Sequence, residues 1–175
     1  LFKFDSKTDY LPYYKTYKLE RDSVTTVGDV LNSIYAIEKF GYLSDEAFFL
    51  RVNNLFASAD AILDDILGDS NELIIEPLSI KRAVNDLIID TKDYQEKLDF
   101  LSSYISESEK ATIIKDKTYM LEYYASNTLH FNEDYIGEHI ILLALDIVKQ
   151  DPSLKEAIFT LLNCENGMSN KSSLK

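Results

Sequence analysis

The sequence predicts an α+β region followed by an all-helical region, and three observations carry this prediction. Apolar and polar residues alternate near the start of the chain, as they do in half-buried strands. After residue 90 the apolar residues instead recur at the spacing of an amphipathic helix. The 175 residues include only five glycines and three prolines, which argues against a linker or a low-complexity protein. We therefore expect two small folded parts that meet near residue 92.

The first part is expected to begin with two paired strands and a helix. Alternation over 1–4 and again over 13–20 predicts the two strands. Thr26-Val-Gly-Asp29 resembles a capping box with Asp in place of the usual Glu. Apolar residues at helical spacing follow it as far as Ile34, so a helix is expected to start at Thr26.

Two further short strands complete the expected first part. One lies at 50–52 and is followed by a turn at Asn53-Asn54, and the other lies at 73–75 and is stopped by Pro77. A small mixed sheet crossed by one helix is the simplest assembly of these elements.

The second part is expected to contain only helices. An apolar stripe from Tyr94 to Ile105 predicts the first of them. Further helices are expected over 117–125, over 136–150, and from Pro152 or Ser153 to Leu162.

Charge and composition exclude several classes of function. A net charge of −12 opposes binding to nucleic acid and to an anionic membrane surface. The one cysteine, Cys164, allows neither an internal disulfide nor a four-cysteine cluster site. The most apolar stretch, Ile140 to Val148, contains Asp146 and is far shorter than the about 20 residues that a bilayer requires. We expect a cytoplasmic protein without a membrane span.

Seven short motifs stand out along the chain. Two of them are Leu73-Ile-Ile-Glu-Pro-Leu-Ser79 and Asn85-Asp-Leu-Ile-Ile-Asp90. The others are Phe2–Asp5 with Tyr13–Tyr17, Thr26–Ile34, Val52-Asn53-Asn54, Asn132–Gly137 and Leu162–Gly167. In their order along the chain they resemble motifs of the iron–sulfur subunit of succinate dehydrogenase or fumarate reductase, in which the first two correspond to an "IEPL" strand and a "DLVVD" segment.

This resemblance implies a fold. It implies a β-grasp domain, similar to 2Fe–2S ferredoxins, over residues 1–92. An α-helical ferredoxin-like domain would follow over 93–168, with a polar tail over 169–175. In the family the first domain binds a flavoprotein and the second binds a membrane anchor. The resemblance thus implies a flavoprotein or related redox subunit as a partner, or self-association, and a place beside the inner membrane through such a partner.

The resemblance does not carry over the chemistry of the clusters. The family holds its clusters with cysteines, and each cluster needs about four thiolate-type ligands. Here none of the corresponding positions is a cysteine, so we expect no cofactor and no catalytic residue. The degenerate cluster positions, which could form an interface instead, are Asp45, Phe48, Asp60, Asp116, Tyr119, Glu122 and Ser126.

Other residues with possible chemistry receive structural roles. Asp45 and Asp60 suit a hard cation, but a site needs more converging ligands than two, so no metal is predicted. His130 and His139 lack a partner at a motif spacing and are expected at the surface or in caps. Cys164 lies beside an acidic residue, which opposes a reactive thiolate.

Tyrosines gather in two places, and each group has two interpretations. One group crowds the first hairpin and the other crowds the helix expected over 117–125. Such groups either anchor a protein partner or pack in the core. In the second group, bulky side chains could fill the volume that a cluster would occupy. The groups are Tyr10, Tyr13, Tyr14 and Tyr17, and Tyr119, Tyr123 and Tyr124.

Three functional hypotheses follow. The leading one is a non-catalytic, cluster-free relative of the iron–sulfur subunit that acts as a protein-interaction or scaffold module. The second is an electron-transfer or other redox subunit whose cofactor is held by non-cysteine ligands. The third is a small-molecule binder that uses the vacated cluster site.

Overall fold

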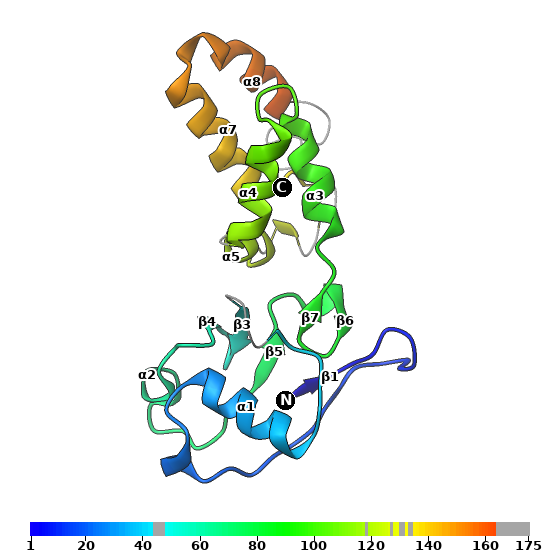
Figure 1. Cartoon of the computed structure of the whole chain (residues 1–175), viewed down its shortest axis with the longest axis vertical. Coiled ribbons are helices and arrows are strands. Elements are labelled where there is room, and N and C mark those ends of the chain that lie inside the picture. Colours follow the sequence, from blue (N-terminus) through cyan, green and yellow to red (C-terminus); the bar gives the residue numbers. More distant parts are fainter. Residues whose placement is uncertain (44–47, 118, 127, 130–131, 133–134, 164–175) are drawn as a thin grey trace, which may run out of the picture. The chain divides into compact units, whose positions relative to one another are not determined.

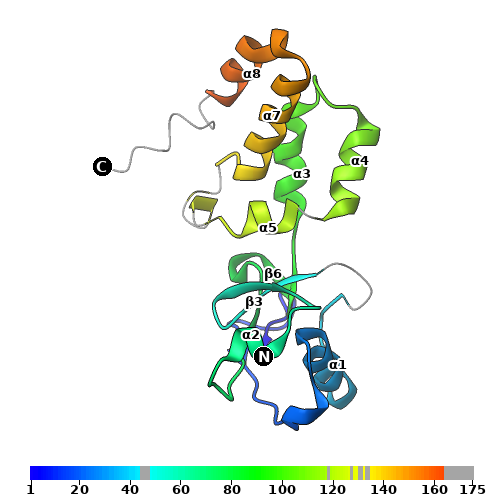
Figure 2. The same ribbon diagram turned by 90° about the vertical axis from the view of Figure 1, so that its left-hand side faces the viewer.

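The chain is an α+β protein. The computed structural model describes residues 1–43, 48–117, 119–126, 128–129, 132 and 135–163 (Figures 1 and 2). It divides into two compact units, Leu1–Asp90 and Thr91–Lys175. Within the described residues all strands belong to the first unit, and the second unit is helical. The expectations for Asp45, His130, Cys164 and the tail 169–175 fall on residues outside this description.

A three-stranded antiparallel sheet lies at the centre of the first unit. Strand β3 (Phe49–Val52) pairs on one side with β4 (Leu55–Ser58) and on the other with β5 (Ile75–Pro77). Asn53 and Asn54 join β3 to β4 with φ of +48° and +65°, the conformation that a two-residue hairpin turn favours. The predicted turn is confirmed, whereas β4 was not predicted. The strand expected over 73–75 is displaced: β5 starts at Ile75 and ends at Pro77, as predicted, with Pro77 paired to Leu50 in an edge strand.

Two separate hairpins complete the first unit. β1 (Phe2–Lys3) pairs with β2 (Tyr13–Tyr14), and β6 (Ala83–Asn85) pairs with β7 (Ile88–Ile89). The expected single mixed sheet is therefore wrong: the strands of the described residues form three sheets, in which every pairing is antiparallel. Two-residue turns join β3 to β4 and β6 to β7, and so short a connection allows only antiparallel pairing, because parallel pairing needs a long crossover.

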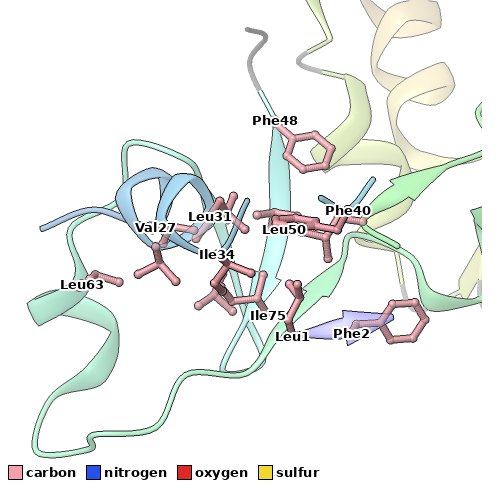
Figure 3. Close-up of a cluster of buried hydrophobic side chains, with 14 of the residues drawn as sticks. Leu1, Phe2, Val27, Leu31, Ile34, Phe40, Phe48, Leu50, Leu63 and Ile75 are labelled. Atoms are coloured by element: carbon pink, nitrogen blue, oxygen red, sulfur yellow. The ribbon is translucent and has the colours of Figure 1, made fainter. Parts of the chain in front are cut away.

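Helix α1 (Val27–Ile37) buries its apolar stripe against the central sheet. Leu31 and Ile34 lie beside Leu50 of β3 in the core (Figure 3). The predicted capping box is present: the Thr26 hydroxyl accepts a hydrogen bond from Asp29 N at 3.1 Å, and the Asp29 carboxylate accepts one from Thr26 N at 2.9 Å. The remaining helices of this unit are short, namely Arg21–Ser23, α2 (Leu63–Leu67) and Ile80–Arg82.

Replacing Thr26 with Ala is expected to lower the free energy of unfolding by about 1 kcal/mol, because the amide of Asp29 loses its acceptor. Thermal and urea denaturation measure the change. Thr26→Ser keeps the accepting hydroxyl and is expected to stay close to the native stability. Equal losses in the two variants would mean that the capping hydrogen bond does not stabilise α1.

A buried carboxylate joins the two ends of the first unit. Asp86 lies in the turn between β6 and β7, with φ of +50°. Its carboxylate accepts hydrogen bonds from the Lys3 ammonium at 2.9 Å, from Phe4 N at 3.0 Å and from Gly41 N at 2.9 Å. Lys3 and Asp86 are both buried, so this ion pair is largely shielded from water.

The second unit consists of helices packed around α7 (Glu138–Gln150). α5 (Tyr119–Tyr124) and α8 (Lys155–Leu162) contact α7, and α4 (Glu107–Asp116) contacts α5. α3 (Lys92–Leu98) continues into a 3-10 turn over Asp99–Leu101, and another such turn, Pro152–Leu154, precedes α8. α4 was not predicted. In the described part of the chain no helix combines the length and the apolar character needed to cross a bilayer.

Candidate functional site

The positions expected to correspond to cluster ligands in the second unit lie on α4, on α5 and just after α5. Asp116 ends α4, Tyr119 and Glu122 belong to α5, and Ser126 follows that helix. Ser126 donates a hydrogen bond from its hydroxyl to the Glu138 carboxylate at 2.7 Å. The structure therefore brings Tyr119, Glu122 and Ser126 to the side of α5 that meets the start of α7.

Buried aromatic side chains occupy the centre of this region. Tyr94 of α3 stacks on Tyr119 with ring centroids 3.8 Å apart and planes 10° from parallel. The Tyr123 ring packs edge to face against two other rings. Its centroid lies 5.1 Å from that of Tyr94 and 4.9 Å from that of Tyr124. Tyr119 is only 3% exposed and the other three rings are fully enclosed. Of the two interpretations of Tyr119, Tyr123 and Tyr124, core packing is confirmed. We call the tyrosine–histidine cluster the set Tyr94, Tyr119, Tyr123, Tyr124 and His139.

His139 provides the polar centre of this cluster. The Tyr94 hydroxyl lies 2.7 Å from His139 Nδ1, and the Glu122 carboxylate lies 3.6 Å from His139 Nε2. The carboxylate favours the tautomer with its proton on Nε2, so that Nδ1 accepts the hydrogen bond from the Tyr94 hydroxyl. Burial lowers the pKa of His139, against the opposing effect of the Glu122 and Asp116 carboxylates. Burial also raises the pKa of Tyr94, so the phenol remains the donor.

The expected surface or capping role of His139 is wrong. Its side chain is buried, with 8% of the residue exposed, and lies on the inward face of α7. The sequence did contain a signal for burial, because His139 lies next to the apolar stripe of its helix. Ile140 and Ala144 of that stripe are fully buried. A histidine in such a stripe needs a buried hydrogen-bond partner, which here is a tyrosine from α3.

The lowered pKa of His139 predicts a pH-dependent stability. The unfolded chain protonates this imidazole near its ordinary pKa of 6.5, whereas the folded protein binds the proton only at lower pH. The free energy of unfolding should therefore fall as the pH decreases from 6.5 towards the pKa of the folded state. Urea denaturation across this range measures the fall, which should be smaller in His139→Gln. NMR titration that finds the His139 pKa at or above 6.5 in the folded protein would contradict the prediction.

Gly137 allows the backbone at the start of α7 to pack closely against the tyrosine–histidine cluster. This residue precedes α7 and has φ of +90°, a conformation that L side chains rarely adopt. A Cβ atom here would lie 2.2 Å from Cε2 of Tyr123. The glycine is thus required both by the backbone and by the enclosed tyrosine ring.

Phe48 and Asp60, the expected positions of the first unit that the structure describes, do not form a site. Phe48 is 3% exposed and belongs to the hydrophobic core (Figure 3). Asp60 is exposed after β4, where its carboxylate accepts a hydrogen bond from the Ser58 hydroxyl. This hydrogen bond lowers the pKa of Asp60. No group of three or more histidine, cysteine, aspartate or glutamate side chains that could hold a metal ion occurs among the described residues.

A small recess opens beside the turn between β3 and β4. It has a volume of about 180 Å³ and is lined by Tyr14, Asn53, Asn54, Ile74 and Glu76, which we call the Tyr14 recess. The Tyr14 hydroxyl donates a hydrogen bond to the largely buried Glu76 carboxylate. Burial and this carboxylate raise the pKa of Tyr14 to about 12. The recess is smaller than pockets for whole small molecules, which have volumes of about 300–1,000 Å³.

Exposed apolar side chains continue from the recess along the first hairpin. Tyr14 and Ile74 are 55% and 51% exposed, and Tyr10 and Tyr13 are also exposed. Tyr17 instead packs partly buried against the core and donates a hydrogen bond to Glu38. In the first tyrosine group, Tyr17 therefore packs against the core, whereas the other three tyrosines lie at the surface. Neither the recess nor the cluster around His139 was predicted from the sequence.

The fold recurs in a solved structure. A hypothetical protein from Helicobacter pylori matches with a TM-score of 0.72 at 24% sequence identity, over 95% of this chain and 32% of that chain. The shared arrangement thus spans nearly all of the present sequence and about a third of the length of the Helicobacter pylori protein. At this identity the similarity establishes the fold alone. No protein-family model and no curated protein matches the chain.

Proposed function

We propose that this protein is a cluster-free relative of the iron–sulfur subunit of succinate dehydrogenase or fumarate reductase, and that it acts as a protein-interaction or scaffold module. In this proposal the first unit is a β-grasp domain and the second is an α-helical ferredoxin-like domain. Its partner is a flavoprotein or related redox subunit, or a second copy of the chain. The protein is cytoplasmic and reaches the inner membrane only through such a partner.

Local geometry at the motifs supports the proposed relationship. The Val52-Asn53-Asn54 motif forms a tight hairpin turn, and the Thr26 motif caps a helix that covers the sheet. Ile75, Glu76 and Pro77 of the "IEPL"-like motif form β5. Asp86 of the "DLVVD"-like motif is the buried carboxylate that joins the two ends of the first unit.

The side chains present do not fit an iron–sulfur cluster. A cluster requires about four thiolate-type ligands, and the chain has one cysteine in its whole length. Tyr119, at one expected ligand position, stacks on Tyr94, and Ser126, at another, is engaged with Glu138. We therefore derive no electron-transfer step through a cluster.

The single observation that carries the proposal is the tight filling of the second unit where the resemblance expects a cluster. Buried tyrosine rings fill the interior of that unit, and close packing is what a stable scaffold needs. The exposed tyrosines beside the Tyr14 recess offer large contact area with a polar end, which suits a protein interface.

Native mass spectrometry of the protein isolated from its own cells tests this proposal. We expect a defined protein partner or a dimer, and no added mass of iron and sulfide. Ile74→Asp should weaken that complex, whereas Ile37→Asp, a matched change at another exposed isoleucine of the first unit, should leave it intact. A bound iron–sulfur or organic cofactor would favour a redox subunit or a small-molecule binder instead. A bare monomer at cellular concentration would contradict the interaction module.

A further inference from the structure

The tyrosine–histidine cluster contains a phenol and a base in the arrangement that proton-coupled oxidation requires. Oxidising a phenol by one electron makes its hydroxyl proton strongly acidic, so the reaction is favoured where a base already accepts that proton. Tyr94 has such a base: its hydroxyl lies 2.7 Å from His139 Nδ1. The imidazole is neutral around pH 7, because burial lowers the pKa of His139, and it can therefore receive a proton.

We propose that Tyr94 and His139 form a redox site, in which Tyr94 loses one electron while its phenolic proton moves to His139 Nδ1. The electron goes to a one-electron oxidant of the peroxyl-radical class, which becomes the corresponding peroxide anion. The products in the protein are a neutral Tyr94 phenoxyl radical and a His139 imidazolium. A one-electron reductant of the ascorbate class returns the electron to Tyr94, and the proton returns from Nδ1 to the phenoxyl oxygen.

The surroundings of the pair stabilise both products. The Glu122 carboxylate, 3.6 Å from Nε2, faces the imidazolium and favours its positive charge. The Tyr119 ring stacks on Tyr94 at 3.8 Å and covers that face of the phenoxyl ring. Tyr94 is fully enclosed, so the radical is kept from the coupling reactions that consume radicals on exposed tyrosines.

A second buried tyrosine in the same unit supplies a matched comparison. Tyr124 is also fully enclosed, and its hydroxyl donates to the Asp93 carboxylate at 2.7 Å. The reference pKa of an aspartate carboxyl is about 2.6 units below that of an imidazole, so a carboxylate is the weaker base and accepts the phenolic proton less readily. Tyr94 thus differs from Tyr124 in the base that its hydroxyl meets, although both phenols are buried and both hydrogen bonds are 2.7 Å long.

Photo-oxidation with electron paramagnetic resonance tests the proposal. The whole chain is oxidised by flash photolysis of tris(bipyridine)ruthenium(II) with persulfate as the electron acceptor, and then frozen for spectra in H₂O and D₂O. We expect a persistent tyrosyl radical that shows a coupling to an exchangeable proton, since the imidazolium donates a hydrogen bond to the phenoxyl oxygen. Tyr94→Phe should lose this signal, and Tyr124→Phe should keep it.

The base is tested separately. Glutamine can accept the hydrogen bond from Tyr94 but cannot take its proton, so His139→Gln should also lose the persistent radical. Thermal denaturation establishes that each variant is folded. A persistent signal that survives in folded Tyr94→Phe or His139→Gln would overturn the proposal. Two results with the wild-type protein would also overturn the proposal. One is the formation of short-lived radicals only, and the other is a persistent radical that shows no coupling to an exchangeable proton.

Discussion

Replacing Tyr119 with Ala is expected to lower the free energy of unfolding of the second unit by about 3–5 kcal/mol, the range for deleting a buried aromatic ring. The ring is 3% exposed and stacks face to face on Tyr94. Its removal leaves a cavity beside three enclosed tyrosines, and the helices that hold them cannot close it without losing their other contacts. Urea denaturation followed by the near-ultraviolet circular dichroism of the tyrosines measures the loss.

Tyr119→Phe is the matched control. It keeps the stacked ring and removes only the hydroxyl, which is hydrogen-bonded to Thr91, so a loss of about 1 kcal/mol is expected. An unchanged stability of Tyr119→Ala would contradict the interpretation that this side chain fills the volume where the resemblance expects a cluster.

Replacing Asp86 with Ala is expected to destabilise the first unit by about 3–5 kcal/mol, the usual cost of leaving one partner of a buried ion pair alone. The substitution removes the acceptor for the Lys3 ammonium and for the amides of Phe4 and Gly41, which all lie within 3.0 Å of the carboxylate. Thermal and urea denaturation of the whole chain measure the effect. Asp64→Ala, at an exposed carboxylate paired with Arg21, should cost less than about 1 kcal/mol.

A double substitution separates the ion pair from the amide hydrogen bonds. Lys3→Met removes the buried charge, so adding it to Asp86→Ala should restore part of the lost stability. If Lys3→Met destabilises the Asp86→Ala protein as much as it destabilises the native one, the unpaired ammonium is not the source of the cost.

The sequence predicted those elements that have strong local signals. Thr26 and Asp29 predicted the start of α1 correctly, because a capping box involves only four consecutive residues. Asn53-Asn54 predicted the hairpin turn for the same local reason. Of the strand expected over 13–20, only Tyr13 and Tyr14 form β2, and Lys15 adds two backbone hydrogen bonds to Leu1. Alternation reports the burial of side chains but not the length of a partner strand.

α4 was missed because its buried side is not apolar. Its buried residue is Lys110, whose ammonium is held by Asp99 at 2.7 Å and by the Ser102 hydroxyl at 2.8 Å. A search for apolar periodicity cannot find such a helix. Ser106 and Glu109 do form a capping box, and this local signal would have predicted where α4 starts.

The candidate sites depend on contacts between distant residues, which explains why they were not predicted. Tyr94 and His139 are 45 residues apart in the sequence, and Tyr14 and Glu76 are 62 residues apart. The tyrosines of α5 were noticed as a group, but Tyr94 on α3 shares no local pattern with them. Only the packing of three helices shows that the group encloses a histidine.

The position of Asp86 has a consequence for synthesis on the ribosome. This carboxylate binds Lys3 and Phe4, which precede it by 83 and 82 residues, so a nascent chain cannot complete its first folding unit until residue 86 has left the exit tunnel. Contacts between residues so far apart slow folding, because a long loop must close before they form. Until then the growing chain carries β1 without the carboxylate that neutralises Lys3, and its exposed apolar segments are the ones a chaperone would bind.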